Sequence, residues 1–272
     1  RGFIMPELPE VETATLGIKP YALNKKIKEV IIREYKLREI IPKEILNLKN
    51  IKIKNIFSRA KYIIIQLSNK KDLIIHLGMS GSLTVQKKDN FIKKHSHVDI
   101  ILEDEIILRF NDPRKFGMVL LVDDYLENKY IKKCGIEPLT NDFLKDYLYK
   151  NSRNRKMPIK NFLMKNDIVV GVGNIYASEC LFKAGIRPDR ESKSLSKNEF
   201  LKLSKIIQKT LKDSIIKGGT TLKDHQSGLG ESGNFQNELF VYGQKKCKNC
   251  RNDIYQIKQN GRTSFYCKTC QK

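Results

Sequence analysis

The 272-residue sequence lacks any long uninterrupted apolar run. No stretch reaches the roughly 18 apolar residues that a membrane-spanning helix needs. Residues 1–5 are too short an apolar segment for a secretory signal peptide and contain no small-residue cleavage site. We therefore expect a cytoplasmic, nucleoid-associated protein with no membrane partner, of a length that suits one large domain or two ordinary ones.

Acidic residues are also scarce, because 30 Asp and Glu stand against 52 Lys and Arg, for a formal net charge of +22. Such an excess predicts a polyanionic partner, and nucleic acid is the usual one. The alternative is a lysine-rich surface produced by a biased genome, since Ile, Lys and Asn are all abundant. Composition alone leaves both interpretations open.

Cysteine is rare outside the C-terminal tail, where four of the six cysteines lie. This distribution argues against a disulfide framework and favours a metal site in a reducing compartment. Cys247 and Cys250 form one CxxC pair, and Cys267 and Cys270 form a second after 16 intervening residues. Four thiolates at this spacing predict one structural Zn²⁺, and the metal must supply much of the folding free energy of so small a tail. The alternative is a polar tail with four reduced cysteines.

Short β-branched runs dominate residues 25–122. They include residues 27–32, 62–67, 73–77, 98–102 and 118–122, and Asn, Asp and Gly separate them. This spacing predicts a β-sandwich or barrel. A helix is expected before these strands, over about residues 6–22, although Pro20 weakens that expectation.

The periodicity becomes helical after about residue 142. One helix is expected over residues 197–217, where Ser196 and Glu199 form a capping box and Gly218 ends the helix. A second is expected over residues 174–184, ending at Gly185. The glycines that precede it, Gly171 and Gly173, could present backbone N–H groups and the positive end of the helix dipole to a phosphate. A tight turn capped by Asn174 would explain the same letters.

Several blocks of the sequence resemble the formamidopyrimidine-DNA glycosylase family almost letter for letter, in the family's order. They are residues 5–13 (MPELPEVET), 59–62 (RAKY), 76–81 (HLGMSG), 112–117 (DPRKFG), 171–179 (GVGNIYASE), 218–222 (GGTTL) and 265–272 (FYCKTCQK). Leu8 favours the branch that acts on purine lesions over the related endonuclease VIII branch.

The resemblance implies an α+β fold with three parts. Residues 6–134 would form a catalytic β-sandwich flanked by helices. Residues 135–235 would form a helix-two-turn-helix DNA-binding domain with a lesion-capping loop over residues 223–235, and residues 236–272 would form a zinc hairpin. The expected partner is double-stranded DNA that contains a damaged base or an abasic site, and we expect a monomer.

The resemblance also implies the chemistry. An oxidised purine (8-oxoguanine or a formamidopyrimidine) would be removed by attack of the Pro6 secondary amine at the sugar C1′. The resulting Schiff base would permit β,δ-elimination at the abasic site. An α-amino group has a pKa of about 7.7–8, so a useful fraction is unprotonated at neutral pH. Glu7 would act as the acid and base at the sugar ring oxygen. Judged without the resemblance, Glu7 and Glu10 are simply acids favoured at a helix N-terminus.

The remaining site residues also follow from the resemblance. Lys61 and Arg262 complete the catalytic set, and both would hold phosphates, as would Asn174. The other DNA-binding residues are Met79, His95, Arg114, Phe116 and Lys156. Met79, Arg114 and Phe116 would fill the gap left by the flipped nucleotide, with Arg114 facing the orphaned base. His76 either supports the backbone or contacts a phosphate.

The sequence departs from the family pattern at its start. Five residues precede Pro6, which makes its nitrogen a tertiary amide that cannot attack a sugar. We expect translation to begin at Met5 with removal of the methionine, or processing of the chain. Smaller departures at residues 14–16, Ser58 and Gln244 remove possible phosphate contacts. The alternatives are a non-catalytic DNA-binding relative with a blocked terminus, and a glycosylase for oxidised pyrimidines.

Overall fold

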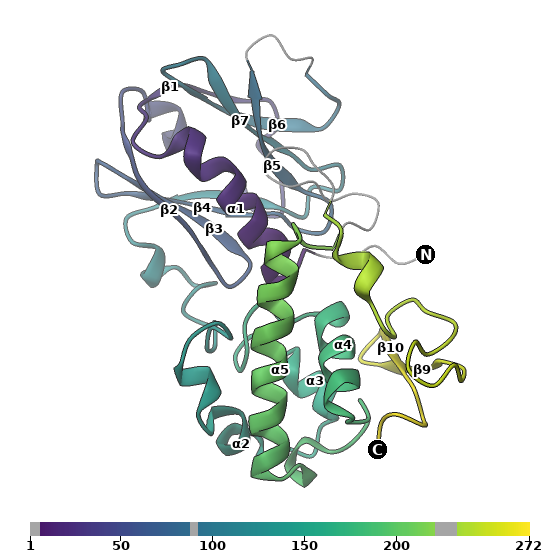
Figure 1. The fold of residues 1–272 in the computed structure, drawn as a ribbon. Helices are drawn as coiled ribbons and strands as arrows, with labels where there is room; N and C mark the ends of the chain where they lie inside the picture. Colours follow the sequence, from purple (N-terminus) through teal and green to yellow (C-terminus); the bar gives the residue numbers. More distant parts are fainter. Residues whose placement is uncertain (1–5, 88–91, 221–232) are drawn as a thin grey trace. The chain divides into compact units, whose positions relative to one another are not determined.

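The computed structural model describes residues 6–87, 92–220 and 233–272, and the chain divides into two compact units (Figure 1). The first unit contains the chain up to Lys132 together with residues 217–236. The second contains residues 133–216 and 237–272. None of the described helices is both long enough and apolar enough to cross a membrane.

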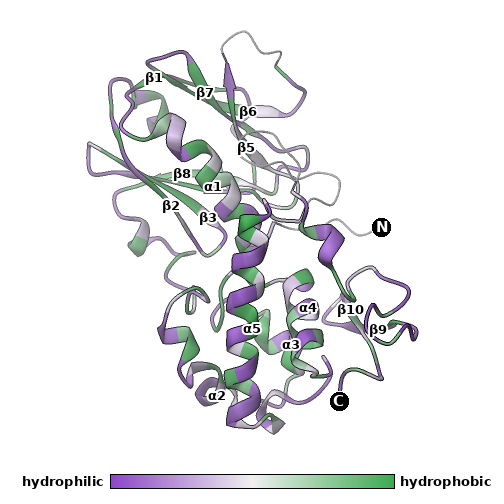
Figure 2. Ribbon diagram, viewed as in Figure 1, coloured by the Kyte–Doolittle hydropathy of each residue, from purple (hydrophilic) through white to green (hydrophobic). Residues whose placement is uncertain are grey.

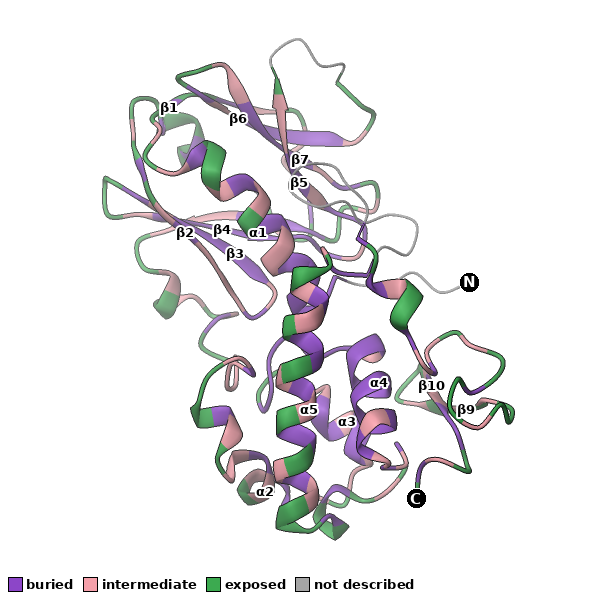
Figure 3. Ribbon diagram, in the orientation of Figure 1, coloured by how far each residue is buried: buried purple, intermediate pink, exposed green. Residues whose placement is uncertain are grey.

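Two four-stranded antiparallel sheets build the first unit, in the orders β1-β6-β7-β5 and β2-β3-β4-β8. The strands are β1 Ile27–Ile32, β2 Ile53–Arg59, β3 Tyr62–Leu67, β4 Asp72–His76, β5 Ser82–Lys87, β6 Ser96–Leu102, β7 Ile106–Asn111 and β8 Met118–Val122. Branched side chains from both sheets form one buried cluster, so the sheets are the layers of a sandwich. Figure 3 shows the buried stretches along these strands. The predicted β-sandwich is confirmed.

Helix α1 (Leu8–Ala22) contributes to the same core and contacts both sheets. It begins with a capping box, in which the Glu7 side chain accepts the backbone N–H of Glu10 and the Glu10 side chain accepts that of Glu7. Pro9 lies in the first turn, where a missing N–H costs nothing. Pro20 lies only in the last turn, so the helix runs to Ala22 as predicted. Short 3₁₀ helices, η1 (Lys43–Asn47) and η2 (Tyr125–Glu127), complete this unit.

Helices α4 (Asn174–Ala184) and α5 (Lys197–Ile216) pack against each other in the second unit. Gly185 ends α4 in the left-handed conformation, at φ 77°, as the sequence predicts. The predicted capping box of α5 is present, since Ser196 and Glu199 exchange side chain to backbone hydrogen bonds. Figure 2 shows apolar and polar positions alternating along α5, whose buried residues include Leu203 and Leu211. The smaller elements of this unit are η3 Asp142–Leu144, α2 Tyr147–Ser152, α3 Ile159–Leu163 and η4 Ser192–Ser194. The 3₁₀ helix η5 (Phe235–Glu238) begins in the first unit and ends in the second.

The chain ends in a two-stranded hairpin, β9 (Tyr255–Gln259) and β10 (Arg262–Tyr266). Asn260 and Gly261 connect the strands, both at positive φ (50° and 71°). Asn-Gly is the pair that a two-residue hairpin turn of this kind favours, because both positions must be left-handed. A β-sandwich with a flanking helix, a helical part and a cysteine-bearing hairpin together confirm the predicted α+β fold class.

Candidate functional site

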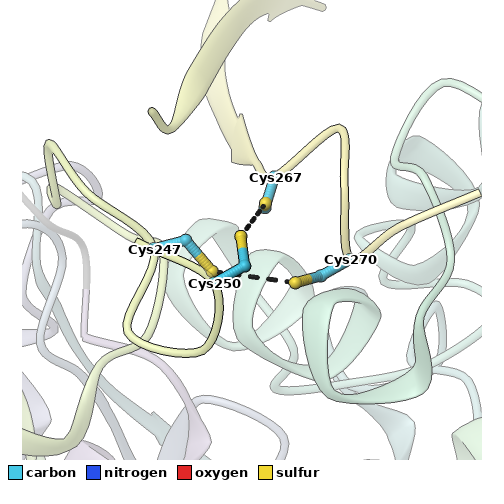
Figure 4. Close-up of side chains that lie close together, drawn as sticks. All are labelled: Cys247, Cys250, Cys267 and Cys270. Carbon is cyan, nitrogen blue, oxygen red and sulfur yellow. Dashed lines mark hydrogen bonds between the residues drawn. The ribbon is translucent and has the colours of Figure 1, made fainter. Parts of the chain in front are cut away.

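Four thiols converge beside the terminal hairpin (Figure 4). Their Sγ atoms all lie within 4.8 Å of one another. The Cys247 and Cys270 sulfurs are 3.8 Å apart, and those of Cys250 and Cys267 are 3.5 Å apart. Tetrahedral zinc with Zn–S bonds of ~2.3 Å places its sulfurs about 3.8 Å apart. The quartet therefore fits one Zn²⁺, and four protein ligands leave no open position, which makes the metal structural.

The electrostatics of the four thiols suit a cation. A backbone hydrogen bond from Asn252 lowers the pKa of Cys250 to about 7. Burial raises the pKa of Cys270 to about 12 and also raises that of Cys267. Four thiolates close together in a partly buried place are therefore costly until a divalent cation balances their charge. This explains why the metal and the folding of the hairpin are linked.

Glu179 holds the chain that leads into the hairpin. The carboxylate of this fully buried α4 residue accepts three backbone N–H groups, from Phe240 at 2.8 Å, Val241 at 2.9 Å and Tyr242 at 2.8 Å. Sequence reasoning did not single out Glu179. Phe240, the first of its partners, lies 61 positions further along the chain. No local pattern in the sequence around Glu179 therefore indicates these contacts.

Asn174 is the first residue of α4, and Gly173 is the N-cap. The alternative of a turn capped by Asn174 is therefore wrong, because the Asn174 amide makes other bonds. Its Oδ1 accepts from Lys160 Nζ at 2.5 Å, and its Nδ2 donates to Tyr242 Oη at 3.4 Å. Lys160 is buried and also donates to Ser264 Oγ of β10 at 2.7 Å. One lysine thus connects α3, the start of α4 and the zinc hairpin.

The other predicted cations of the second unit are exposed. Arg262 is the first residue of β10, where it pairs with Gln259 across the hairpin. Lys156 lies in the segment before α3. Because both side chains are exposed, they are accessible to a ligand that binds at the protein surface. Arg262 lies near Lys160, because the Lys160 ammonium donates to the carbonyl of Thr263 and to the hydroxyl of Ser264. These are the two residues that follow Arg262 in β10.

Pro6 and Glu7 are both buried at the start of α1 in the first unit. The backbone N–H of Glu7 donates to Glu10 Oε2 at 2.9 Å, and Glu10 Oε1 accepts the backbone N–H of Thr220 at 2.8 Å. Gly219 is left-handed (φ 80°), and a Cβ there would lie 3.1 Å from Glu10 Oε1. The two oxygens of Glu10 therefore fix the α1 N-terminus to the segment that precedes residues 221–232. The predicted capping loop lies largely outside the described residues.

Lys61 occupies the tight β2–β3 turn after Ala60, which has a positive φ of 58°. Its charge acts on His76, which lies opposite Tyr62 in the sheet. The pKa of His76 is lowered to about 4, mainly because the ring is buried and also because of the charges of Lys61 and Arg38. The neutral ring accepts the backbone N–H of Gly78 on Nδ1 at 2.9 Å. Of the two roles considered for His76, the structure shows backbone support.

Two loops carry three of the predicted DNA-binding residues. Met79 lies on the loop between β4 and β5, and Arg114 and Phe116 lie on the loop between β7 and β8. Ser80 joins the two loops. The Ser80 hydroxyl accepts the backbone N–H of Arg114 at 3.2 Å. The Arg114 guanidinium lies 4.8 Å from the centre of the Phe116 ring, and Phe116 is 45% exposed although it is large and apolar. His95 precedes β6 and accepts the backbone N–H of Asp112 at 3.0 Å. Met79, His95, Arg114 and Phe116, four of the predicted DNA-binding residues, thus lie on loops at one end of the sandwich strands.

Comparisons with known proteins agree on one family. Three family models match: the formamidopyrimidine-DNA glycosylase N-terminal domain over residues 5–119, its H2TH (helix-two-turn-helix) domain over residues 134–226, and a zinc finger found in FPG and IleRS over residues 244–272. Formamidopyrimidine-DNA glycosylases of Haemophilus ducreyi and Glaesserella parasuis are 47% and 46% identical over 272 residues. These alignments cover 98% of this chain and 98% and 99% of the relatives.

Solved structures give the same result. FPG (MutM) of Thermus thermophilus superposes with a TM-score of 0.87 at 30% identity, covering 98% of both chains. A Lactococcus lactis FPG variant in complex with Fapy-dG containing DNA superposes with a TM-score of 0.90 at 31% identity, covering 98% of this chain and all of the other.

A β-sandwich, an H2TH domain and a tetrathiolate zinc finger, in this order, define a class of DNA glycosylases that also cleave abasic sites. The chain belongs to the formamidopyrimidine-DNA glycosylase family. It is accordingly a base-excision repair enzyme with DNA glycosylase and AP lyase activity, and it carries one structural zinc.

Proposed function

We propose that this enzyme removes oxidised purines from double-stranded DNA and cleaves the strand by β,δ-elimination through a Schiff base to Pro6. The observation that carries the proposal is the buried Pro6-Glu7 pair at the start of α1, whose backbone is fixed by Glu10. A secondary amine at this position would attack C1′, and the bond to the base would break with its electrons leaving on the base. Loss of the amine proton and opening of the sugar ring at its protonated oxygen would give the iminium, which makes the C2′ and C4′ hydrogens acidic. Loss of a proton from C2′ would expel the 3′ phosphate, and loss of a proton from C4′ would then expel the 5′ phosphate. Water would finally hydrolyse the iminium and release the enzyme.

The remaining assignments belong to the same proposal. Glu7 would exchange a proton with the sugar ring oxygen, while Lys61, Asn174 and Arg262 would hold phosphates. Arg114 would face the orphaned base, Met79 and Phe116 would fill the gap, and His95 and Lys156 would contact the backbone. In domain terms, residues 6–134, 135–235 and 236–272 would be the catalytic, H2TH and zinc-finger parts.

The choice of purine lesions is supported by relatives and by Leu8. Lactococcus lactis FPG structures include complexes with Fapy-dG containing DNA and with abasic-site DNA. One further complex of that protein holds DNA with an oxidised pyrimidine, at a TM-score of 0.89 and 31% identity. That complex favours oxidised pyrimidines as a second substrate class for this chain. A panel of duplexes, each with one lesion of either class opposite cytosine or adenine, ranks the two.

The decisive test of Pro6 compares two forms of one chain. The first starts at Pro6 and has a free secondary amine, and the second keeps residues 1–5, which make the same nitrogen a tertiary amide. An α-amino group has a pKa of about 7.7–8, so the first form holds reactive amine at neutral pH. Borohydride should trap a covalent complex with lesion DNA for the first form alone, with the crosslink mapping to Pro6. Equal trapping by both forms would rule Pro6 out as the nucleophile.

Glu7→Gln separates the two steps. The amide cannot protonate the ring oxygen, so base excision should fall far more than cleavage at a preformed abasic site. The capping bond should survive, because an amide oxygen also accepts the N–H of Glu10. Equal loss on both substrates would contradict the assigned role of Glu7.

A further inference from the structure

Asp112 is a fully buried carboxylate directly after β7. Its Oδ1 accepts the Ser80 hydroxyl at 2.7 Å and the backbone N–H of Arg114 at 3.3 Å. Its Oδ2 accepts the backbone N–H of Gly117 at 2.7 Å. The carboxylate therefore joins the loop that carries Met79 to both ends of the loop that carries Arg114 and Phe116.

The backbone of Asp112 extends the same junction to a third segment. Its N–H donates to the carbonyl of His95 at 3.0 Å, and its own carbonyl lies 2.8 Å from His97 Nε2. His95 directly precedes β6, and His97 is its second residue. One residue thus connects the three segments on which four predicted DNA-binding residues lie.

The two loops also touch backbone to backbone. Gly78 is left-handed (φ 66°), and a Cβ there would lie 2.5 Å from both Gly117 N and the Phe116 carbonyl carbon. A Cβ at Gly117 would lie 2.8 Å from the carbonyl oxygen of His76 and 3.0 Å from Asp112 Oδ2. No side chain could stand between the loops here. The two loops are therefore packed backbone to backbone, and the Asp112 carboxylate is hydrogen-bonded to both of them.

We propose that Asp112 is a positioning residue that holds Met79, Arg114 and Phe116 as one preformed wedge, and that it thereby sets discrimination among the bases opposite the lesion. The inference rests on the proposed function, in which these three side chains enter the DNA stack. If the loops had to become ordered when the DNA binds, the entropy cost of ordering them would reduce the affinity for DNA. A pair of loops that is already fixed avoids this cost. The placement of base-reading groups depends on such supporting bonds.

Asp112→Asn tests the proposal with almost no change in volume. The amide replaces one acceptor oxygen with an N–H₂ group, so it must face a donor, either the N–H of Gly117 or the pair on Oδ1. We expect kcat/KM on a lesion opposite cytosine to fall about tenfold, which corresponds to about 1.4 kcal/mol. We also expect the preference among the four opposing bases to flatten. Cleavage of an abasic site in a single strand has no opposing base to read, so it should change by less than about twofold.

A second variant and a control guard against simple misfolding. Ser80→Ala removes one bond from Asp112 Oδ1 and leaves the carboxylate in place, so it should shift the opposing-base preference in the same direction by a smaller amount. Asp72→Asn alters another buried carboxylate of the first unit, which accepts the backbone N–H of Tyr125 at 2.9 Å at the far end of β4. This control should leave the opposing-base ranking as it is in the unaltered chain.

A fluorescent purine in the strand opposite the lesion reports wedge entry directly, because unstacking brightens it. The unaltered chain and Asp72→Asn should brighten it equally, and Asp112→Asn should brighten it less. If Asp112→Asn and Ser80→Ala both keep the ranking and the fluorescence change, the inference is overturned while the proposed function stands. If the unaltered chain neither excises oxidised purines nor cleaves abasic sites, the proposed function itself fails.

Discussion

Acid should destabilise the first unit through His76. The ring is only 7% exposed, and burial with the charges of Lys61 and Arg38 lowers its pKa from 6.5 to about 4. In the unfolded chain His76 takes up a proton below its ordinary pKa, whereas the folded chain resists until about pH 4. The contribution of the neutral His76 ring to the unfolding free energy is therefore fully present above pH 6.5, and it is lost as the pH falls from 6.5 toward 4. The difference between a pKa of 6.5 and one of about 4 corresponds to about 3 kcal/mol of unfolding free energy at most.

The assay needs a reporter confined to the first unit, because the whole chain need not unfold in one step. The sequence has no Trp, so Phe57→Trp introduces a single tryptophan, whose emission can be excited apart from that of the tyrosines, beside Tyr125, whose ring lies 5.4 Å from that of Phe57. Urea titrations of this reporter between about pH 4.5 and 7.5 give the unfolding free energy at each pH.

His76→Asn removes the titrating ring, and its Oδ1 can still accept the N–H of Gly78. It should lower stability at neutral pH through lost packing but flatten the dependence between about pH 4.5 and 6.5. Tyr62→Phe perturbs the neighbouring ring, 4.9 Å away, and adds no group that titrates in this range, so the acid dependence should persist. If His76→Asn keeps the slope of the reporter chain, burial of His76 is not its source.

Three further predictions concern the second unit and the DNA contacts. Cys267→Ser should abolish binding of one equivalent of zinc, measured by metal analysis, and should weaken DNA binding by unfolding the hairpin. Glu179→Gln should cost about 2–3 kcal/mol in urea unfolding, because one charge-assisted backbone bond becomes a donor–donor contact, whereas Glu191→Gln at an exposed ion pair should cost almost nothing. Arg262→Ala should weaken binding equally for every opposing base and lower the salt slope by about one, while Arg114→Ala should flatten the preference among opposing bases, worth about 1–3 kcal/mol. Reversal of these last two outcomes in titrations over salt would mean that the roles are exchanged.

Local signals explain what the sequence could predict. The end of α4 at Gly185 depends on one left-handed residue, and the start of α5 depends on two side chains three positions apart. The zinc quartet follows from the spacing of two CxxC pairs, and β1, β3 and β8 follow from runs of branched residues. In each case the cause lies within a few neighbouring positions, or in a spacing that a metal imposes.

The contacts that sequence reasoning missed are those between positions far apart in the chain. Glu10 binds the backbone of Thr220, 210 positions away, and Lys160 binds Ser264, 104 positions away. Asp112 binds Ser80 across 32 positions. Nothing in the letters around these residues marks the donor that each one will meet, because only the folded chain brings the two together. The roles of the DNA-facing residues stay predictions, since they depend on a molecule that the protein must bind.

The placement of acids also bears on how so basic a chain remains stable. Among the described residues, the buried carboxylates are Glu7, Glu10, Asp72, Asp99, Asp112 and Glu179. All but Asp99, which pairs with Arg33 and Arg109, accept backbone N–H groups. A carboxylate that binds backbone N–H groups holds the chain together without occupying a lysine or arginine. Interior acids used in this way fix loops and helix ends, and the excess positive charge stays available at the surface, where a polyanion such as DNA can use it.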